Sequence, residues 1–284
     1  MITVSIVLYK TSIFYIDRLL KCVSDSNIIN FIYIIDNSPS PINFNFSNYS
    51  KVIYIKSKNI GYGSAHNIAL KKIIDFSDFH FIINPDIYFD SKILEVLFNR
   101  INLDNNIGLL MPKVLYPNGD LQFLCKKLPT PLDLFLRRFS IFFPRKFIDK
   151  CYLNYELQYF NYRQELNVPY LSGCFMLLRV SSLKMIGIFD ARFFMYAEDI
   201  DLSRRMHAFF KTLYYPHVFI YHEHAKSSYK NIYMLLLHIF SIVKYFNKWG
   251  WFFDSERRFF NKRLFQHILD LDNIKSLDHL NSLK

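Results

Sequence analysis

The chain has 284 residues, of which 51% are hydrophobic and 18% aromatic, enough for one large domain with a sizeable core plus an appendage. Its formal net charge of +11 favours an anionic partner such as a nucleotide, a nucleic acid or a lipid phosphate. Four scattered cysteines lack metal-ligand spacing and no apolar run reaches about 20 residues, which argues against a zinc site and a membrane span.

Strands alternate with helices through the first hundred residues. Short β-branched and aromatic runs predict buried strands, and longer segments between them predict helices. This alternation predicts an α/β fold with a mostly parallel sheet, in which ligands bind beyond the carboxyl ends of the strands. The predicted strands are 3–8, 31–35, 52–55 and 79–83, and the predicted helices are 13–23, 61–74 and 91–100.

The character of the sequence changes after a short strand expected at 108–111 and a turn at 116–120. Residues 126–150 interleave basic and large apolar side chains with three prolines, so we expect neither a regular helix nor a strand there. One interpretation is a surface insertion with a small core of its own. The other is a loop at a membrane interface, where aromatic side chains enter the headgroup region and four cations meet lipid phosphate: Arg137, Arg138, Arg145 and Lys146.

The last fifty residues have the pattern of an amphipathic helical tail. Residues 231–246 predict a helix with an almost continuous apolar surface that is too short to span a bilayer. Tryptophans and phenylalanines beside a basic cluster then favour a helix lying in a membrane interface, with packing on the domain or on a second subunit as the alternative. These residues are Trp249, Trp251, Phe252, Phe253, Arg257, Arg258, Lys262 and Arg263.

Three carboxylates, Glu198, Asp199 and Asp201, stand at the predicted start of a helix. Acids there are stabilised by unpaired N–H groups and by the helix dipole, so simple capping is one interpretation. An aromatic patch precedes the acids, however, and aromatic neighbours desolvate a carboxylate and raise its pKa, which suits a general base. The patch consists of Phe193, Phe194 and Tyr196.

Further candidates follow the predicted strands of the first half. Asp36 lies in Asp-Asn-Ser-Pro, which is strong turn chemistry. Gly61 and Gly63 open a helix where backbone N–H groups could approach phosphate, although capping by Ser64 explains the pattern as well. Asp86, in Asn-Pro-Asp, is either a turn residue or a carboxylate ligand for a metal.

Two long segments resemble the acceptor-side signature of the inverting family 2 glycosyltransferases. They are SGCFMLLR at 172–179 and GIFDARFFMYAEDIDLSRR at 187–205. Three earlier segments are similar to donor-side motifs of the same family, namely VSIVLYKTS, NIGYGSAHN and NPD. The resemblance covers about residues 1–228 and is strongest to the rhamnosyltransferase-like branch that builds bacterial surface polysaccharides.

The resemblance implies a GT-A fold, which is a three-layer α/β/α sandwich with a mixed, mostly parallel sheet. Residues 1–228 would form this domain, with 126–168 as a variable insertion that could meet a membrane, and 229–284 would form the amphipathic tail. Asp199 would deprotonate the acceptor hydroxyl in a single inverting displacement, and Glu198 would orient the acceptor. The other acceptor-side residues would be Ser172, Gly173 and Tyr196.

The resemblance also implies a site for a nucleotide-diphospho-sugar donor. Asp36 would accept the N3–H of uracil or thymine, and Arg205 would support the site through Asp201 or the diphosphate. Asp86 would be the single carboxylate ligand of Mg²⁺ or Mn²⁺, because Asn84 stands where many such enzymes carry another acid. His222 would complete the metal site, with His224 as its rival. The donor-site residues are Tyr9, Thr11, Asp36, Asn59, Gly61, Asn67, Asn84, Asp86 and Arg205.

The branch suggests dTDP-L-rhamnose as donor, with UDP-galactose, UDP-galactofuranose and UDP-N-acetylglucosamine left open. The acceptor would be a glycan on a polyprenyl diphosphate at the cytoplasmic face of the bacterial plasma membrane, in O-antigen, capsule or cell-wall synthesis. The scattered cysteines fit a reduced cytosolic protein, and no signal peptide is expected. Peripheral membrane contact would fit the charge and the tail.

Two other classes of protein are compatible with parts of the sequence. A nucleic-acid-binding protein would explain the charge, but the basic residues form no clean stripe and no recognition motif occurs, so we expect no nucleic-acid partner. A non-catalytic sugar-nucleotide-binding scaffold would keep Asp36 and Asn59 and would need no base. The oligomeric state stays open.

Overall fold

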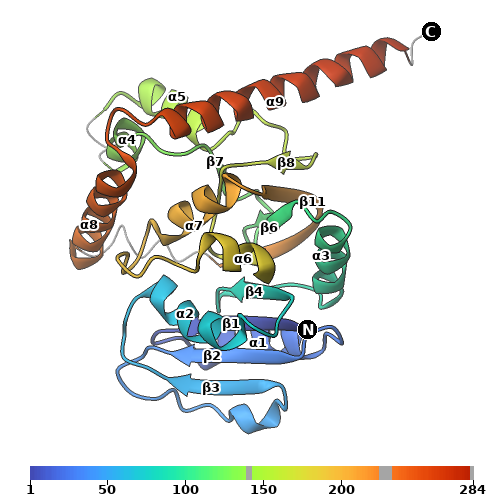
Figure 1. The fold of residues 1–284 in the computed structure, drawn as a ribbon, viewed down its shortest axis with the longest axis vertical. Coiled ribbons are helices and arrows are strands. Elements are labelled where there is room, and N and C mark those ends of the chain that lie inside the picture. Colours follow the sequence, from blue (N-terminus) through green and yellow to red (C-terminus); the bar gives the residue numbers. More distant parts are fainter. Residues whose placement is uncertain (139–142, 224–231, 282–284) are drawn as a thin grey trace.

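A mixed nine-stranded sheet forms the centre of the molecule in the computed structural model, which describes residues 1–138, 143–223 and 232–281 (Figure 1). The strand order is β3-β2-β1-β4-β10-β6-β11-β5, and β8 pairs with β11. A separate two-stranded sheet joins β7 (Cys125–Lys126) to β9 (Tyr170–Leu171). The strands of the large sheet are β1 (Ile2–Leu8), β2 (Phe31–Asp36), β3 (Val52–Lys56), β4 (Phe79–Ile83), β5 (Ile87–Tyr88), β6 (Ile107–Leu115), β8 (Leu166–Asn167), β10 (Phe175–Arg179) and β11 (Lys211–His222).

The first four long strands run parallel, as their alternation with helices predicted. β1 pairs in parallel with β2 and β4, and β2 pairs in parallel with β3. β10 then enters antiparallel between β4 and β6, and β6 pairs in parallel with β11. This order brings the start of β10 beside the carboxyl ends of the parallel strands.

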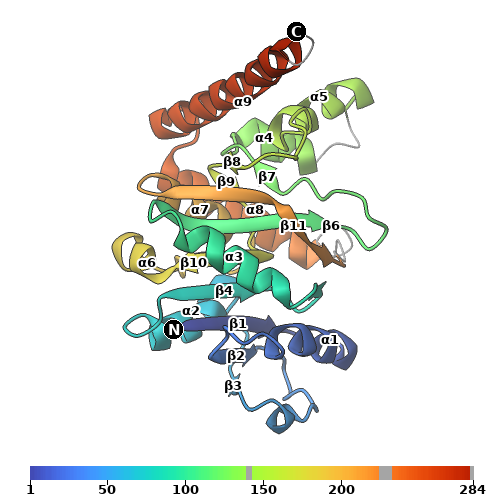
Figure 2. The same ribbon diagram turned by 90° about the vertical axis from the view of Figure 1, so that its right-hand side faces the viewer.

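Helices cover both faces of the sheet, which confirms the predicted three-layer arrangement (Figure 2). Successive side chains of a strand point to opposite faces, so Ile6 and Leu8 of β1 join one core cluster while Val7 joins the other. α1 (Ile13–Ser24) and α3 (Lys92–Asn102) pack on the first face. α2 (Tyr62–Ile73), α6 (Val180–Ile186) and α7 (Glu198–His207) pack on the second, and a short 3₁₀ helix, η1 (Phe46–Asn48), precedes β3.

The basic and aromatic segment after residue 126 contains two helices, so the expectation of neither helix nor strand there was wrong. α4 spans Pro131–Arg138 and α5 spans Arg145–Tyr155. Thr130 and Asp133 start α4 with reciprocal capping bonds. The Thr130 Oγ1 accepts from the Asp133 N–H at 3.1 Å, and Asp133 Oδ2 accepts from the Thr130 N–H at 2.9 Å. Pro131 fits the first helical position, where no N–H is needed.

Two helices form the tail, as its pattern predicted. α8 spans Ile232–Trp249 and α9 spans Ser255–Asn281, and α9 extends away from the body of the molecule (Figure 1). Tyr245, Phe246 and Phe260 of the tail share a core cluster with the 128–200 region. Within the described ranges, no helix combines the length and the apolar composition needed to cross a bilayer.

Candidate active site

The acceptor-side and donor-side motifs meet at the carboxyl end of the sheet. β10 runs antiparallel to β4, so Phe175 pairs with Ile83 and the segment before β10 lies beside the segment after β4. The Asn84 N–H donates to the Cys174 carbonyl oxygen at 2.8 Å. Strand pairing therefore brings Gly173 and Asn84 together, although 89 positions separate them in the chain.

Asp199 accepts hydrogen bonds through both of its carboxylate oxygens. Its Oδ1 accepts from the Ile200 N–H at 2.9 Å, and its Oδ2 accepts from the Gly173 N–H at 3.0 Å and from the Tyr170 hydroxyl at 3.2 Å. A Cβ atom at Gly173 would lie 3.1 Å from the Asp199 Cβ, so a larger residue there would have to displace the acid. Tyr170 was not singled out from the sequence; β9 is placed here by its pairing with β7 and by the bonds between Leu171 and Ser203 of α7.

The backbone immediately before Asp199 adopts an unusual conformation. Tyr196 has φ +70° and Ala197 has φ +111°, both in the left-handed region that residues other than glycine rarely adopt. Backbone strain of this kind persists where the surroundings fix it, and it gathers at functional sites. Here the ring of Tyr196 packs edge-on against His238 of α8, with 4.8 Å between ring centroids.

The two adjacent acids have unlike surroundings. Burial raises the pKa of Glu198 to about 8, and the neighbouring charge of Asp199 adds to the effect. Burial also raises the pKa of Asp199, but the Gly173 N–H and the charge of Lys126 oppose it. Asp199 accepts three hydrogen bonds, whereas Glu198 Oε2 has no hydrogen-bond partner among the described residues. Asp199 is therefore the carboxylate that ionises first, and Glu198 keeps a proton at neutral pH.

Tyr62 links the donor-side and acceptor-side segments, a role that sequence reasoning missed. Its hydroxyl lies 2.7 Å from the Gly173 carbonyl oxygen and 2.9 Å from Asn84 Oδ1, and either can accept its proton. Its N–H donates to the Phe194 carbonyl oxygen at 2.9 Å. Gly61 permits this approach, since it has φ +91° and its Cβ would lie 2.1 Å from the same oxygen. The Gly-Tyr-Gly segment thus holds the loop before α7.

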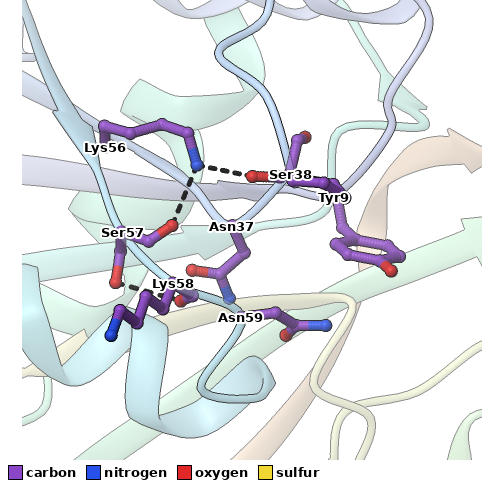
Figure 3. Close-up of a pocket in the computed structure, with 8 residues that line it drawn as sticks. Tyr9, Asn37, Ser38, Lys56, Ser57, Lys58 and Asn59 are labelled. Atoms are coloured by element: carbon purple, nitrogen blue, oxygen red, sulfur yellow. Dashed lines mark hydrogen bonds between the residues drawn. The ribbon is translucent and has the colours of Figure 1, made fainter.

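A cavity of about 480 Å³ opens beyond β1, β2 and β3 (Figure 3). Tyr9 and Asn59, both expected at the donor site, lie on its wall together with Asn37 (Figure 3). Lys56 donates to the carbonyl oxygens of Ser38 and Ser57 and so joins the two loops. The lining residues are Tyr9, Asn37, Ser38, Pro39, Lys56, Ser57, Lys58 and Asn59.

Asp36 does not line this cavity. It is fully buried, with Oδ1 accepting from the Ser38 N–H at 2.8 Å and Oδ2 from the Ile42 N–H and the Tyr54 hydroxyl at 3.0 and 2.7 Å. In this geometry Asp36 stabilises the turn at Asp-Asn-Ser-Pro. At this turn, the polar side chains that line the cavity are those of Asn37 and Ser38.

Two other expected donor-site residues use their polar groups inside the protein. Both ends of the Asn67 amide bond the main chain of Phe189, at 2.8 and 3.1 Å. Arg205 donates to Asp201 Oδ2 at 2.8 Å and to the carbonyl oxygens of 186–188. Arg205 therefore has the contact with Asp201 that was expected. Its guanidinium bonds groups within the protein and is not turned toward a diphosphate.

The smaller side chains of the site cap its turns. Thr11 Oγ1 accepts from the Tyr9 N–H at 3.2 Å, and Asn59 Oδ1 accepts from the Gly61 N–H at 3.3 Å. Ser172 Oγ accepts from the Cys174 N–H at 3.4 Å. These contacts fix the loops after β1 and β3 and before β10.

Asp86 and His222 come together as expected, with 3.4 Å between Asp86 Oδ1 and His222 Nε2. The Gln122 Nε2 donates to the His222 carbonyl oxygen at 2.7 Å, which leaves Gln122 Oε1 facing His222 Nδ1 at 3.0 Å. That network assigns the hydrogen of a neutral ring to Nδ1 and turns the basic Nε2 toward Asp86. Gln122 was not expected from the sequence.

The pair fits part of a divalent-cation site. Neighbouring ligands of an octahedral Mg²⁺ ion lie roughly 3 Å apart for bonds of about 2.1 Å, so the observed gap suits two ligands of one cation. In the part of the chain that the structure describes, no group of three or more His, Cys, Asp or Glu side chains could hold a metal. His224, the rival ligand, lies outside the described residues.

No protein-family model matches the chain. Curated relatives from two strains of Mycobacterium tuberculosis, CDC 1551 / Oshkosh and ATCC 25618 / H37Rv, are each 26% identical over 181 residues. Both are N-acetylglucosaminyl-diphospho-decaprenol L-rhamnosyltransferases. The match covers 60% of this chain and 58% of each relative, so the chain spans less than two thirds of their length.

Solved structures with a similar fold share little sequence with the chain. GalNAc-T7 with UDP, GalNAc and Mn²⁺ is 14% identical with a TM-score of 0.58, over 78% of this chain and 42% of that one. S. aureus TarS 1–349 in complex with UDP is 16% identical with a TM-score of 0.53, over 85% and 65%. The chain has the GT-A glycosyltransferase fold. This GT-A assignment confirms the predicted fold class, and the curated match confirms the resemblance to rhamnosyltransferases.

Proposed function

We propose that this chain is an inverting glycosyltransferase that moves L-rhamnose from dTDP-L-rhamnose to a hydroxyl of a lipid-linked glycan. The observation that carries the proposal is the setting of Asp199. It is a partly buried carboxylate with three hydrogen-bond donors, next to the Asn84 segment where the donor diphosphate is expected. A fixed base beside a donor site is what a single displacement requires.

In the proposed reaction, the acceptor oxygen attacks the anomeric carbon on the face opposite the nucleotide. The new C–O bond forms as the bond from carbon to the diphosphate oxygen breaks, and the diphosphate leaves with the electron pair. Asp199 takes the acceptor proton, so the configuration inverts without a covalent intermediate. Glu198 stays protonated beside it, and the site therefore carries a single carboxylate charge near the attacking oxygen.

Asp86 with His222 would hold Mg²⁺ or Mn²⁺, which when bound neutralises charge on the diphosphate. Their 3.4 Å separation and the orientation of His222 by Gln122 support this assignment. The Mn²⁺ bound to GalNAc-T7 shows divalent-cation use within the same fold. The role of the metal in this chain rests on these two residues.

The cavity beyond β1–β3 would receive the nucleotide. Tyr9 offers an exposed ring on which a base can stack, and Asn37 and Asn59 offer amides for a pyrimidine edge. The rhamnosyltransferase names of the curated relatives favour dTDP-L-rhamnose. The TarS complexes with UDP and UDP-GlcNAc keep UDP-linked galactose, galactofuranose or GlcNAc as the alternative donors.

The acceptor would be a glycan on a polyprenyl diphosphate. The curated relatives act, by name, on N-acetylglucosaminyl-diphospho-decaprenol. A net charge of +11 would favour approach to a lipid-linked diphosphate. We therefore place the enzyme peripherally at the cytoplasmic face of the bacterial plasma membrane, in the synthesis of O-antigen, capsule or cell-wall polysaccharide.

Donor titration by calorimetry tests the proposal. The protein is titrated with dTDP-L-rhamnose and with the UDP-sugars, with and without Mn²⁺ or Mg²⁺, and the titrations are repeated with Asp86→Ala. We expect metal-dependent binding of one donor that Asp86→Ala weakens at least about tenfold, because a single carboxylate anchors the cation. Absence of binding under every condition would refute the donor site.

Asp199→Asn separates an enzyme from a binding scaffold. The amide keeps the shape of the side chain but cannot take a proton, so turnover should fall roughly 10²- to 10⁴-fold while donor affinity stays the same. Asn161→Asp, on an exposed loop, is the control for the amide–acid exchange. Unchanged turnover in Asp199→Asn would leave only the scaffold interpretation.

A further inference from the structure

The turn between α8 and α9 presents large apolar side chains to solvent. We call Trp251, Phe252 and Phe253 the aromatic turn; Phe252 is 74% exposed and Phe253 is 90% exposed. The outward sides of the two flanking helices continue this surface. Their exposed apolar residues are Leu236, Ile239 and Phe240 on α8 and Phe259, Phe265 and Leu269 on α9. Exposed apolar patches of this kind mark interaction sites.

The aromatic turn is held firmly by its surroundings. Gly250 has φ +96°, and a Cβ there would lie 2.9 Å from the Phe253 carbonyl oxygen, so only glycine fits the bend. Trp251 donates through Nε1 to Asn247 Oδ1 at 2.8 Å, and its carbonyl oxygen accepts from Arg257 Nη2 at 2.9 Å. Phe252 and Phe253 therefore project from a fixed frame rather than from a loose loop.

The charge around the aromatic turn is positive. Arg258, Lys262 and Arg263 are exposed on α9 and alternate with Phe259 and Phe265. The nearest acids on the same helix are engaged or distant. Glu256 accepts from Arg204, and Asp270 lies two turns beyond Arg263. Interleaved aromatic and basic side chains match the acyl boundary and the phosphates of an anionic membrane.

Other side chains of α8 are bonded to the loop 190–197 before α7, which we call the acceptor loop. Ser241 donates to the Met195 carbonyl oxygen at 2.6 Å, and Lys244 donates to the Arg192 carbonyl oxygen at 2.8 Å. Trp249 Nε1 donates to Asp201 Oδ1 at 2.8 Å. Trp249 and the buried Arg257 thus face the protein, which corrects the expectation that both belong to the interfacial surface.

We propose that the aromatic turn, with the outward sides of α8 and α9, is the docking surface for a bilayer containing anionic lipid. Docking there would hold the loop 190–197, which α8 carries, beside the lipid headgroups. The proposal concerns lipid binding alone, and it stands whether or not the chain transfers a sugar.

A second copy of the chain fits this surface less well. A two-fold contact places the same patch on both partners, so Arg258, Lys262 and Arg263 of each copy would meet their equivalents. Like charges brought together in this way repel, whereas anionic headgroups neutralise them. Charge complementarity therefore favours the bilayer.

Vesicle sedimentation with the full chain tests the docking surface. The probes are vesicles of phosphatidylcholine alone and of phosphatidylcholine mixed with phosphatidylglycerol. Phe252→Ser with Phe253→Ser should weaken binding to the anionic vesicles at least about tenfold, because two inserted aromatic rings are lost. The matched control is Leu103→Ser with Met185→Ser, which changes side chains that are 83% and 62% exposed, at the end of α3 and on α6, and should bind as the unchanged protein does.

A second pair of variants tests the charges. Arg258→Glu, Lys262→Glu and Arg263→Glu together should weaken binding by more than the roughly fivefold expected for one lost cation. Lys71→Glu, Lys72→Glu and Lys92→Glu make the same charge change on exposed residues of α2 and α3 and should have a smaller effect. Circular dichroism of each variant establishes that it is folded.

Three outcomes would overturn the proposal. Equal binding of the Phe252/Phe253 variant and the unchanged protein would place the contact elsewhere. Equal capture by both kinds of vesicle would remove the anionic requirement. A dimer of the unchanged protein in sedimentation velocity that the Phe252/Phe253 variant abolishes, with no vesicle binding, would assign the surface to a second copy.

Discussion

Glu198 and Asp199 are adjacent acids, yet the structure gives them opposite chemistry. Asp199 accepts from three donors, two in the 170–173 segment and one in α7, and Glu198 faces Gly63, whose Cβ would lie 3.2 Å from its own. Pairs of acids pushed apart in pKa by their surroundings are how one site holds both a base and a neutral partner. The protonated Glu198 is therefore as much a part of the site as the ionised Asp199.

This assignment predicts how stability depends on pH. An unfolded chain releases the Glu198 proton near the ordinary pKa of 4.5, whereas the folded protein keeps it up to about pH 8. The free energy of unfolding should therefore fall as pH rises through that window, by up to about 1.4 kcal/mol per pH unit from this group. Glu198→Gln removes this titrating group. Its free energy of unfolding, measured with urea at pH 5.5, 6.5 and 7.5, should therefore decrease less with pH than that of the unchanged protein.

Glu95→Gln is the matched control, because Glu95 is an exposed acid of α3. Its stability should follow that of the unchanged protein at all three pH values. If Glu198→Gln and Glu95→Gln gave parallel pH dependences, Glu198 would not hold the proton assigned to it here.

The sequence predicted the acids and the glycines of the site better than it predicted their partners. Asp199, Gly173 and the Asp86–His222 pair lie together as expected, because motif spacing fixes which strand ends carry them. Tyr62, Tyr170 and Lys126 were missed, since each reaches the site through tertiary pairing that no local pattern records. Asp36 and Asn67 were assigned to the donor, and in this structure their polar groups bond nearby protein groups, while Arg205 pairs with Asp201, one of the two roles expected for it. A motif identifies a polar residue without showing which neighbour uses it.

Helix α7 carries Asp199, the proposed base, near its first residue and is tied to the tail along its length. Arg204 is buried and donates to both oxygens of Asp254 at 2.7 Å and to Glu256 at 2.8 Å. Its guanidinium also stacks 4.1 Å from the centre of the Trp249 ring. One turn of α9 and the end of α8 thus fix the orientation of α7.

Breaking this ion pair from one side should be costly. Arg204→Met leaves the Asp254 carboxylate buried without its bidentate partner, and we expect a loss of about 3–5 kcal/mol in the free energy of unfolding. Arg204→Met with Asp254→Asn removes the stranded charge and should recover part of that loss. Guanidinium denaturation of the single and double variants measures both, and additive effects would show that the pair is not coupled.

Elements with a clear period were predicted to within a few residues, and the segment without one was not. The predicted strand at 79–83 agrees with β4, and the predicted helix at 13–23 agrees with α1. α4 was missed because interleaved prolines and cations hide its pattern, although Thr130 and Asp133 carry a capping signal. In this stretch the capping residues were evidence for a helix, whereas the spacing of hydrophobic residues was not.

The boundary at residue 228 divides the sequence by character, but the core does not divide there. Tyr245, Phe246 and Phe260 pack with Tyr170, Phe193 and other residues of the 128–200 region. Leu264 and Ile268 of α9 join the core on the α7 side of the sheet. At about 2 kcal/mol for each buried apolar side chain, these five contribute on the order of 10 kcal/mol. That is similar to the total stability of a typical domain, which is about 5–15 kcal/mol.

A chain ending at residue 228 should therefore lose the folded state of its 128–200 region, including Tyr196 and, in the first turn of α7, Asp199. We expect a broad, non-cooperative thermal transition by circular dichroism and aggregation on size exclusion, because the core cluster around Phe193 opens to water. A chain ending at residue 271 keeps Leu264, Ile268 and the Arg204 contacts, and it should melt as cooperatively as the full chain. Cooperative melting of the 228 chain at the temperature of the full chain would mean that the tail is an independent unit. In that case α8 would not rigidly connect the proposed bilayer surface to the loop 190–197.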